Sequence, residues 1–167
     1  EVVQDEATAL DELIAQHGDT YALIVRSDKV TAEVIDALPE LRVIIRAGAG
    51  YNTIDTRRAR ARGIDVMNTP GANANAVAEE VIALMLADAR HVVQADPSVR
   101  AGRWEKKQFM GREISGKTLG IVGLGAIGQT LARRLSGFDI TLLGYDPFIS
   151  EERAAALGVE LTDLKAL

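Results

Sequence analysis

The stretch that decides the fold is Gly123-Leu124-Gly125-Ala126-Ile127-Gly128. It follows the apolar run 118–122, which predicts a buried strand, and it opens the segment from 126 to about 136, whose apolar spacing predicts a helix. Strand, G-x-G-x-x-G turn and helix in this order are typical of a turn that binds a dinucleotide pyrophosphate. The first glycine permits the tight turn, Gly125 lets the backbone approach the phosphates, and Gly128 lets helix and strand pack closely. The free N–H groups at the helix start favour the phosphate charge.

An acidic residue follows the next predicted strand, residues 140–145. Asp146 lies about 20 residues after Gly123, where dinucleotide-binding domains place the carboxylate that accepts hydrogen bonds from ribose hydroxyls. A phosphate at the 2′ position would be repelled there, and Pro147-Phe148 follows rather than an arginine. These residues predict NAD rather than NADP as the cofactor. The alternative is a turn of the same shape that binds nothing.

Strands and helices alternate along the rest of the chain, which predicts an α/β fold with parallel sheets. The predicted strands cover residues 21–26, 41–46, 64–68, 118–122, 140–145 and a short stretch near Val159. The predicted helices cover 31–38, 54–62, 74–95, 126–136 and 151–157, and residues 162–166 begin another. The composition becomes Ala-rich after Pro70-Gly71, which predicts a boundary between a first unit, 1–71, and a second unit, 72–167.

Composition excludes several classes of function. With 47% hydrophobic and 26% charged residues, the chain is typical of a soluble globular protein. A net charge of −5 argues against a nucleic-acid partner, so we interpret Arg57, Arg58, Arg60 and Arg62 as a solvated helix face. The absence of cysteine excludes disulfides and thiol catalysis. No apolar run reaches the ~18 residues of a membrane span, and residues 1–6 lack the features of a signal peptide, so we expect no membrane partner and a cytoplasmic location.

Several motifs together resemble the D-isomer-specific 2-hydroxyacid dehydrogenases, and most of all the members that act on a phosphorylated acid. The resemblance covers nearly the whole chain. It is carried by Leu23-Ile24-Val25-Arg26-Ser27, Arg46-Ala47-Gly48-Ala49-Gly50-Tyr51-Asn52, Asn68-Thr69-Pro70, Trp104-Glu105-Lys106-Lys107-Gln108-Phe109-Met110-Gly111, Gly116-Lys117-Thr118-Leu119-Gly120-Ile121-Val122-Gly123 and Tyr145-Asp146-Pro147. The resemblance implies a flavodoxin-like, incomplete substrate lobe at 1–71, whose first strand we expect to be missing. It also implies the N-terminal half of a Rossmann NAD-binding domain at 72–167.

The same resemblance implies the roles of particular residues. Arg26 and Ser27 would lie at the substrate phosphate, and Arg46 close to the active-site cleft. The backbone of Ala47, Gly48, Ala49 and Gly50 would receive the substrate carboxylate and, through Ala49, reach the nicotinamide. The amides of Ala126 and Ile127 would meet the pyrophosphate, although relatives often carry an arginine where this chain has Ala126. The alternatives to substrate binding are purely structural: a surface ion pair for Arg26 and an ordinary tight turn at 47–50.

The catalytic groups that the family uses are a His paired with a Glu, and an Arg, which by the resemblance would lie beyond residue 167. The sequences around His17 and His91 do not resemble the segment that carries the family's catalytic His, so we expect both to be surface or packing residues. We expect Trp104 to pack under the long helix. The chain alone is therefore expected to be inactive, with no metal site. The resemblance also implies a homodimer through the 74–95 helix. The alternative functions are an NAD-binding regulatory module of the same fold and a structural fragment that binds nothing.

Overall fold

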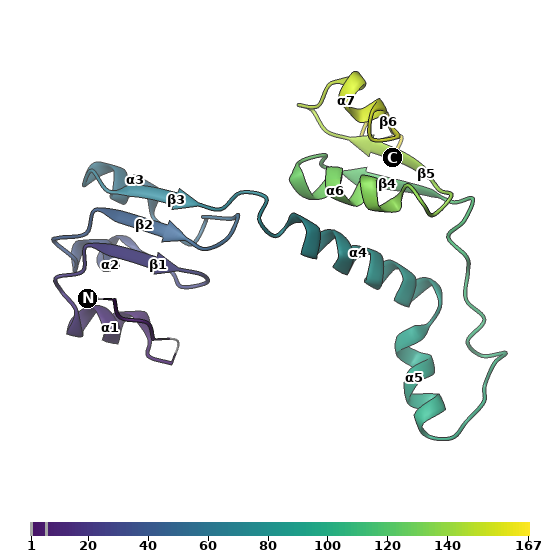
Figure 1. Ribbon diagram of the computed structural model, residues 1–167, viewed down its shortest axis with the longest axis horizontal. Helices are drawn as coiled ribbons and strands as arrows, with labels where there is room; N and C mark the ends of the chain where they lie inside the picture. Colours follow the sequence, from purple (N-terminus) through teal and green to yellow (C-terminus); the bar gives the residue numbers. More distant parts are fainter. Residues whose placement is uncertain (1, 6) are drawn as a thin grey trace. The chain divides into compact units, whose positions relative to one another are not determined.

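The computed structural model describes residues 2–5 and 7–167, and the chain divides into two compact units, Glu1–Ala72 and Asn73–Leu167 (Figure 1). Each unit contains its own three-stranded parallel sheet and its own hydrophobic core. The α/β fold class predicted from the alternation of strands and helices is therefore confirmed. Among the described residues, no helix combines the length and the apolar character that a membrane crossing requires.

The first unit is a parallel sheet with strands in the order β1-β2-β3, connected by helices. The strands are β1 (Ala22–Val25), β2 (Val43–Arg46) and β3 (Asp65–Asn68). The helices are α1 (Leu10–Gln16), α2 (Ala32–Asp36) and α3 (Thr56–Ala61). The side chain of Thr31 caps the N-terminus of α2 and that of Asp55 caps α3. Sequence analysis missed α1, which has no fully buried residue and no side-chain cap.

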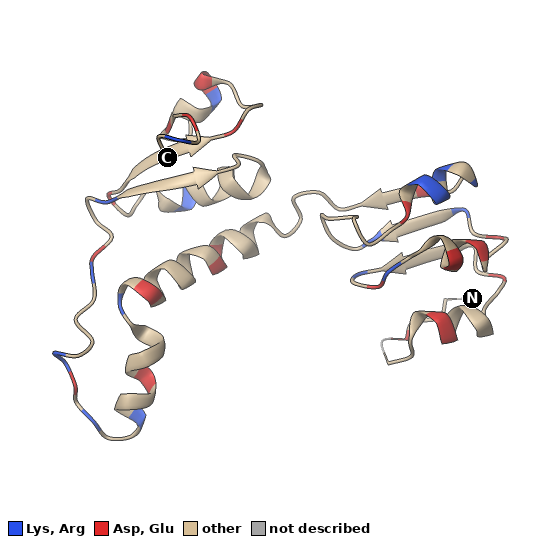
Figure 2. Ribbon diagram, turned by 180° about the vertical axis from the view of Figure 1, so that it is seen from behind, with Lys and Arg blue, Asp and Glu red and all other residues tan. Residues whose placement is uncertain are grey.

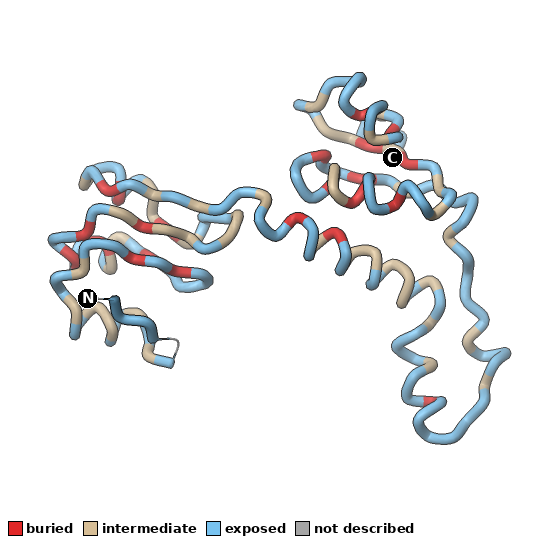
Figure 3. Tube along the Cα trace, viewed as in Figure 1, coloured by how far each residue is buried: buried red, intermediate tan, exposed pale blue. Residues whose placement is uncertain are grey.

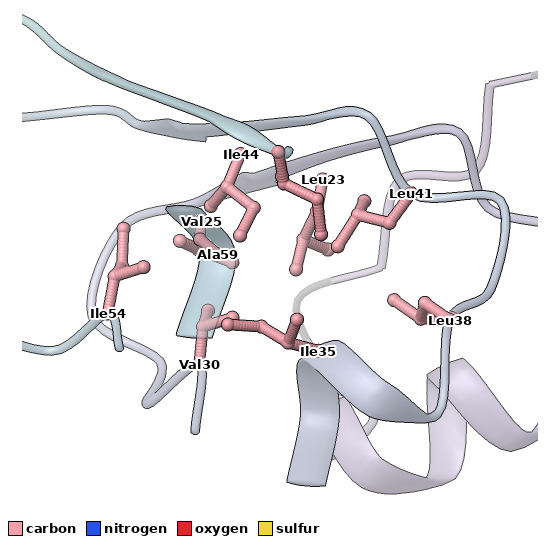
Figure 4. Packing of buried hydrophobic residues seen from close by; sticks show 10 residues of the cluster. Leu23, Val25, Val30, Ile35, Leu38, Leu41, Ile44, Ile54 and Ala59 are labelled. Carbon is pink, nitrogen blue, oxygen red and sulfur yellow. The ribbon is translucent and has the colours of Figure 1, made fainter. Parts of the chain in front are cut away.

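The core of the first unit lies between its sheet and the helices α2 and α3 (Figure 4). Ile35, Leu38, Leu41 and Ile44 are fully buried there. Burying a side chain of this size stabilises a fold by about 1.5–3 kcal/mol relative to leaving it exposed. The apolar residues at helical spacing in 31–38 and in the strand 41–46 thus form the contacts that their patterns predicted.

The arginines of α3 do more than form a solvated face. Figure 2 shows positive charge along this helix, and Arg57 and Arg60 are exposed as expected. Arg58, however, forms an ion pair with Asp36 of α2 at 2.7 Å. Arg62 donates hydrogen bonds to backbone carbonyl oxygens at and after the end of α2, those of Ile35, Leu38 and Pro39. Arg58 is still exposed to solvent, so the prediction of a solvated face holds for it. It was wrong for Arg62, which is partly buried because the carbonyl groups at and after the end of α2 need donors.

The second unit has strands in the order β4-β5-β6, all parallel. The strands are β4 (Thr118–Val122), β5 (Thr141–Tyr145) and β6 (Val159–Leu161). The helices are α4 (Ala74–Ala89), α5 (Val92–Arg100), α6 (Ala126–Leu135) and α7 (Glu151–Ala155). Helix α4 packs on α6, with Ala78 fully buried and Leu131 and Leu135 of α6 in the same core.

Three expectations for the second unit were wrong. The single helix expected over 74–95 is two helices, because His91 adopts a left-handed conformation (φ 53°) that ends the hydrogen-bonded spiral between α4 and α5. Residues 162–166, expected to begin a helix, contain only a turn at 164–166. Trp104 is 82% exposed instead of packed. The carboxylate of neighbouring Glu105 accepts hydrogen bonds from Ser98 and Arg103, and this holds the segment beside the end of α5 without covering the indole.

Candidate functional site

The glycine turn of the second unit has the geometry that a pyrophosphate-binding turn needs. Gly123 follows β4 with φ +93°, a conformation that L side chains rarely adopt. At Gly125 a Cβ atom would meet nothing within 4 Å, so the backbone is open to a ligand there. At Gly128, which is buried, a Cβ atom would collide with the carbonyl oxygen of Gly123. Each glycine therefore has the structural reason that the motif predicts.

The N-terminus of α6 presents unpaired N–H groups beside this turn. Gly125 is the N-cap residue, and no side chain caps the helix. In the described part of the chain, the N–H groups of Ala126, Ile127 and Gly128 donate to no acceptor, whereas the Gln129 N–H already bonds the Gly125 carbonyl oxygen at 3.0 Å. Unpaired N–H groups together with the helix dipole favour an anion at this position.

Asp146 holds the turn from the neighbouring strand. It follows β5, and one of its carboxylate oxygens accepts a hydrogen bond from the Leu124 N–H at 2.7 Å, while the other accepts from the Phe148 N–H at 2.8 Å. These two bonds, with that to Phe148 the stronger influence, lower the pKa of Asp146 below the ordinary aspartate value. The carboxylate is therefore ionised at neutral pH, beside the turn, where it can also accept a hydrogen bond from a ribose hydroxyl.

These residues fit NAD. The open backbone at Gly125 and the unpaired N–H groups of α6 suit a pyrophosphate, and the ionised Asp146 suits unmodified ribose hydroxyls and repels a 2′-phosphate. Ala126 offers only its backbone N–H to the phosphates, with no cationic side chain.

The candidate substrate residues of the first unit gather at one edge of its sheet. Val25, Arg46 and Asn68 are the last residues of β1, β2 and β3, and the register pairs Val25 with Arg46 and Arg46 with Asn68. Arg26 and Ser27 follow β1 directly, and both are exposed. In parallel α/β sheets, ligands bind outside the carboxyl ends of the strands, which is this edge.

The turn at residues 47–50 is held on several sides. The Ala47 N–H donates to the Val25 carbonyl oxygen at 2.8 Å, which ties the turn to β1. The Thr69 N–H donates to the Gly48 carbonyl oxygen at 3.0 Å, and the Asn68 side-chain Nδ2 donates to the Ala49 carbonyl oxygen at 2.7 Å. In the same described region, the N–H groups of Ala49 and Gly50 have no acceptor.

Arg46 lies across this turn. A Cβ atom on Gly48 would collide with the end of the Arg46 side chain, so the guanidinium lies directly against the Gly48 backbone. Its Nε is buried and has no hydrogen-bond partner in the described chain. A buried N–H donor without a partner is costly.

Outside these two turns, the described chain offers a groove and no cluster of metal ligands. An open groove of about 450 Å³ runs beside α3 and β3 and is lined by Tyr51, Arg60, Met67 and Asn68 among others, but it contains neither Arg26 nor Arg46. Within residues 2–5 and 7–167, no three His, Asp or Glu side chains gather as metal ligands. Sequence analysis did not single out Asn68 as a functional residue. Its side-chain bond to Ala49 depends on the pairing of β2 with β3, which no local pattern reveals.

Comparison with known proteins agrees with this geometry. Residues 82–167, about half of the chain, match the model of the D-isomer specific 2-hydroxyacid dehydrogenase, NAD binding domain. The chain belongs to this family. The prediction of the family from its motifs and the prediction of NAD as the cofactor are therefore confirmed, and the second unit is an NAD-binding domain.

One similar curated protein is the D-3-phosphoglycerate dehydrogenase of Archaeoglobus fulgidus, which is 49% identical over 94% of this chain and 30% of that protein. Relatives at 44–49% identity share that name, and the chain spans about a third of their length.

Among solved structures, D-lactate dehydrogenase from Escherichia coli is similar with a TM-score of 0.82 and 31% identity, over 95% of this chain and 51% of that one. The NAD-dependent formate dehydrogenase from Staphylococcus aureus in complex with NAD has a TM-score of 0.82 and 28% identity, over 94% of this chain and 48% of that one. These structures share the fold of both units with this chain, although their names give different substrates.

Proposed function

We propose that the protein is an NAD-dependent dehydrogenase that oxidises 3-phosphoglycerate to 3-phosphohydroxypyruvate, the reaction that begins serine synthesis. The observation that carries the proposal is the edge of the first sheet, where exposed Arg26 and Ser27 lie in the same row of strand ends as Arg46 and the 47–50 turn. A molecule with an anion at each end suits this pair of sites. The relatives named D-3-phosphoglycerate dehydrogenase support this choice over lactate or formate.

Different residues of the first unit would bind the two ends of the substrate. Arg26 and Ser27 would bind the phosphate, because an arginine and a hydroxyl offer it several charge-assisted hydrogen bonds. The N–H groups of Ala49 and Gly50 would bind the carboxylate, and the Arg46 guanidinium against Gly48 adds positive charge at the same turn. Ala49 would also contact the nicotinamide end of the cofactor.

The residues of the second unit would hold the cofactor, with the Asp146 carboxylate on the ribose hydroxyls and the amides of Gly125, Ala126 and Ile127 on the pyrophosphate. NAD, when bound, supplies the hydride acceptor. Loss of the hydroxyl proton needs a base. Of the two histidines, His17 follows α1 and His91 precedes α5, so neither follows a strand of the first sheet. We therefore expect residues 1–167 alone to bind NAD without turning over substrate.

The test is an assay of the full-length protein with NAD and three candidate substrates: 3-phosphoglycerate, D-lactate and formate. NADH formation with 3-phosphoglycerate supports the proposal, and loss of that activity in Arg26→Ala would connect it to the proposed phosphate site. If the protein oxidises only D-lactate or only formate, that compound is the substrate and the assignment of 3-phosphoglycerate is wrong. Saturable NAD binding with no turnover of any of them would favour the NAD-binding regulatory module instead.

We also propose that the protein is a homodimer through α4 and α5. Both helices carry apolar side chains that nothing in their unit covers, among them Leu84, Val92, Val93 and Val99. Figure 3 shows that the buried residues of α4 lie near its start and that α5 is largely exposed. A cluster of exposed apolar residues of this kind is typical of a protein–protein contact.

Sedimentation of the wild-type chain and of two α5 variants tests the dimer. Val93→Asp places a charge on the apolar surface and should give a monomer. Gln94→Asp adds the same charge at the neighbouring exposed polar position and should leave the dimer intact. A wild-type protein that stays monomeric at high concentration would refute the dimer.

A further inference from the structure

Two donors at the end of β3 hold the turn that follows β2. The Asn68 Nδ2 donates to the Ala49 carbonyl oxygen at 2.7 Å, and the Thr69 N–H donates to the Gly48 carbonyl oxygen at 3.0 Å. Both distances are those of well-formed hydrogen bonds. The register pairs Asn68 with Arg46, so its side chain starts level with the first residue before the turn.

These two bonds fix the direction of the next two N–H groups. A trans peptide is planar, so a carbonyl and the N–H of the following residue point in opposite directions, and none of the described peptides is cis. Because the carbonyl groups of Gly48 and Ala49 point to the end of β3, the N–H groups of Ala49 and Gly50 point away from it. Neither has an acceptor in the described chain, and two such successive N–H groups form a concave site for an anion.

We propose that Asn68 is a positioning residue for the substrate carboxylate. It touches the Ala49 carbonyl and not the substrate, and it acts by keeping the Ala49 and Gly50 N–H groups aimed at the bound anion. The proposal rests on the proposed function, in which the 47–50 turn binds the carboxylate of 3-phosphoglycerate. It also distinguishes the two ends of that substrate, because the Asn68 side chain bonds Ala49 in the turn and not Arg26 or Ser27.

Amide NMR of the ¹⁵N-labelled chain, titrated separately with D-glycerate and with inorganic phosphate, tests the proposal. D-Glycerate carries the carboxylate without the phosphate, and it should shift the Ala49 and Gly50 amide resonances of the wild type. Asn68→Ala should weaken D-glycerate binding about fivefold, the effect of losing one neutral hydrogen bond. Asn68→Asp should weaken it further, because it sets an oxygen against the Ala49 carbonyl oxygen. Phosphate binding should stay unchanged in both variants.

In the full-length enzyme the same variants should raise the KM for 3-phosphoglycerate by a similar factor and leave kcat nearly unchanged. Thr31→Ala is the matched control, because it removes the N-cap of α2 in the same unit without touching the turn. Its unfolding temperature should fall while its affinity for D-glycerate stays at the wild-type value. If it loses affinity as Asn68→Ala does, general destabilisation explains both variants and the positioning role is refuted.

The outcomes separate the two proposals. A wild-type chain whose Ala49 and Gly50 amides do not respond to D-glycerate would refute the carboxylate site, and the role of Asn68 with it. A wild-type response together with affinities within twofold in Asn68→Ala and Asn68→Asp would refute the positioning role alone. A variant that does not fold leaves the other variant and the KM measurement to decide.

Discussion

Each unit ends a parallel strand in a glycine-rich turn, but the two turns are held by different chemistry. After β4, residues 123–128 lead directly into α6, and the carboxylate of Asp146 accepts a backbone N–H of the turn. After β2, residues 47–50 are separated from α3 by residues 51–55, and Asn68 and Thr69 donate to carbonyl groups of the turn. The first arrangement uses up an N–H group of the turn and relies on the helix start for anion binding. The second uses up carbonyl groups and leaves N–H groups of the turn itself for the anion.

Removing the carboxylate that holds the first turn should have the largest effect. Asp146→Ala should weaken NADH binding about 100-fold, because it loses a charge-assisted hydrogen bond to the ribose together with the bond to the Leu124 N–H. Calorimetric titration with NADH measures the change. Binding of D-glycerate to the first unit should stay as in the wild type.

Asp163→Ala is the matched control for this variant. The Asp163 carboxylate also accepts two backbone N–H bonds, from Lys165 and Ala166, but it lies outside the turn. Its removal should leave NADH affinity within twofold of the wild type. If Asp163→Ala and Asp146→Ala weaken NADH binding equally, the assignment of Asp146 to the cofactor is wrong.

The cofactor turn could be predicted from sequence because everything that defines it is local. Its glycines, the helix that starts at Ala126 and the acid after the next strand all follow one another in a single strand-helix-strand segment. Each glycine then has a physical reason that a residue type alone can signal: a positive φ at Gly123, open space at Gly125 and close contact at Gly128.

The second largest effect is expected for Gly125→Ala, which should weaken NADH binding without destabilising the fold. Its φ of −72° suits alanine and a Cβ atom there meets nothing in the chain, so Gly125→Ala should keep or slightly raise the unfolding temperature. The same methyl group occupies the space that the pyrophosphate approaches, so NADH binding should weaken about tenfold, which corresponds to about 1.4 kcal/mol. Thermal unfolding and NADH titration of the same sample measure both.

Gly137→Ala is the comparison for that variant, since a Cβ atom there also meets open space and the residue lies beyond the end of α6. Gly137→Ala should change neither the unfolding temperature nor the NADH affinity by much. Unaltered NADH affinity in Gly125→Ala would mean that the pyrophosphate does not approach the backbone at this glycine.

The 47–50 turn could be predicted only in part. Its small residues marked a turn, and the resemblance to a family assigned it to the substrate, but the donors that orient it come from the end of another strand. The same limit explains Arg62, whose partners are carbonyl groups at and after the end of α2. The helix break at His91 likewise has no signal in an Ala-rich apolar pattern. For Asn68 and Arg62 the deciding contact joins segments far apart in the sequence, so neighbouring residues do not signal it.

A smaller effect is expected at Gly48 in the second turn. A Cβ atom there would collide with the end of the Arg46 side chain, which is flexible and can move away. Gly48→Ala should therefore change the unfolding free energy by less than about 1 kcal/mol, but weaken D-glycerate binding about threefold because the guanidinium leaves the turn. Gly18→Ala, in open space in the same unit, is the control and should bind normally. Normal binding by Gly48→Ala would exclude Arg46 from the site.

The smallest expected effect is that of acid pH, which should alter the 123–128 turn, held by a carboxylate, and not the 47–50 turn. The backbone N–H groups of Phe148 and Leu124 lower the pKa of Asp146, so the carboxylate contributes fully above the ordinary aspartate pKa and is lost only as pH falls through its own lower value. Between about pH 5 and 8, its bonds and NAD affinity should change less than twofold. Below pH 4, the amide resonances of Leu124 and Phe148 should shift together, whereas those of Ala49 and Gly50 should not, since the Asn68 amide that holds their turn does not titrate. A midpoint at or above the ordinary aspartate value would show that the two N–H groups do not hold the ionised carboxylate.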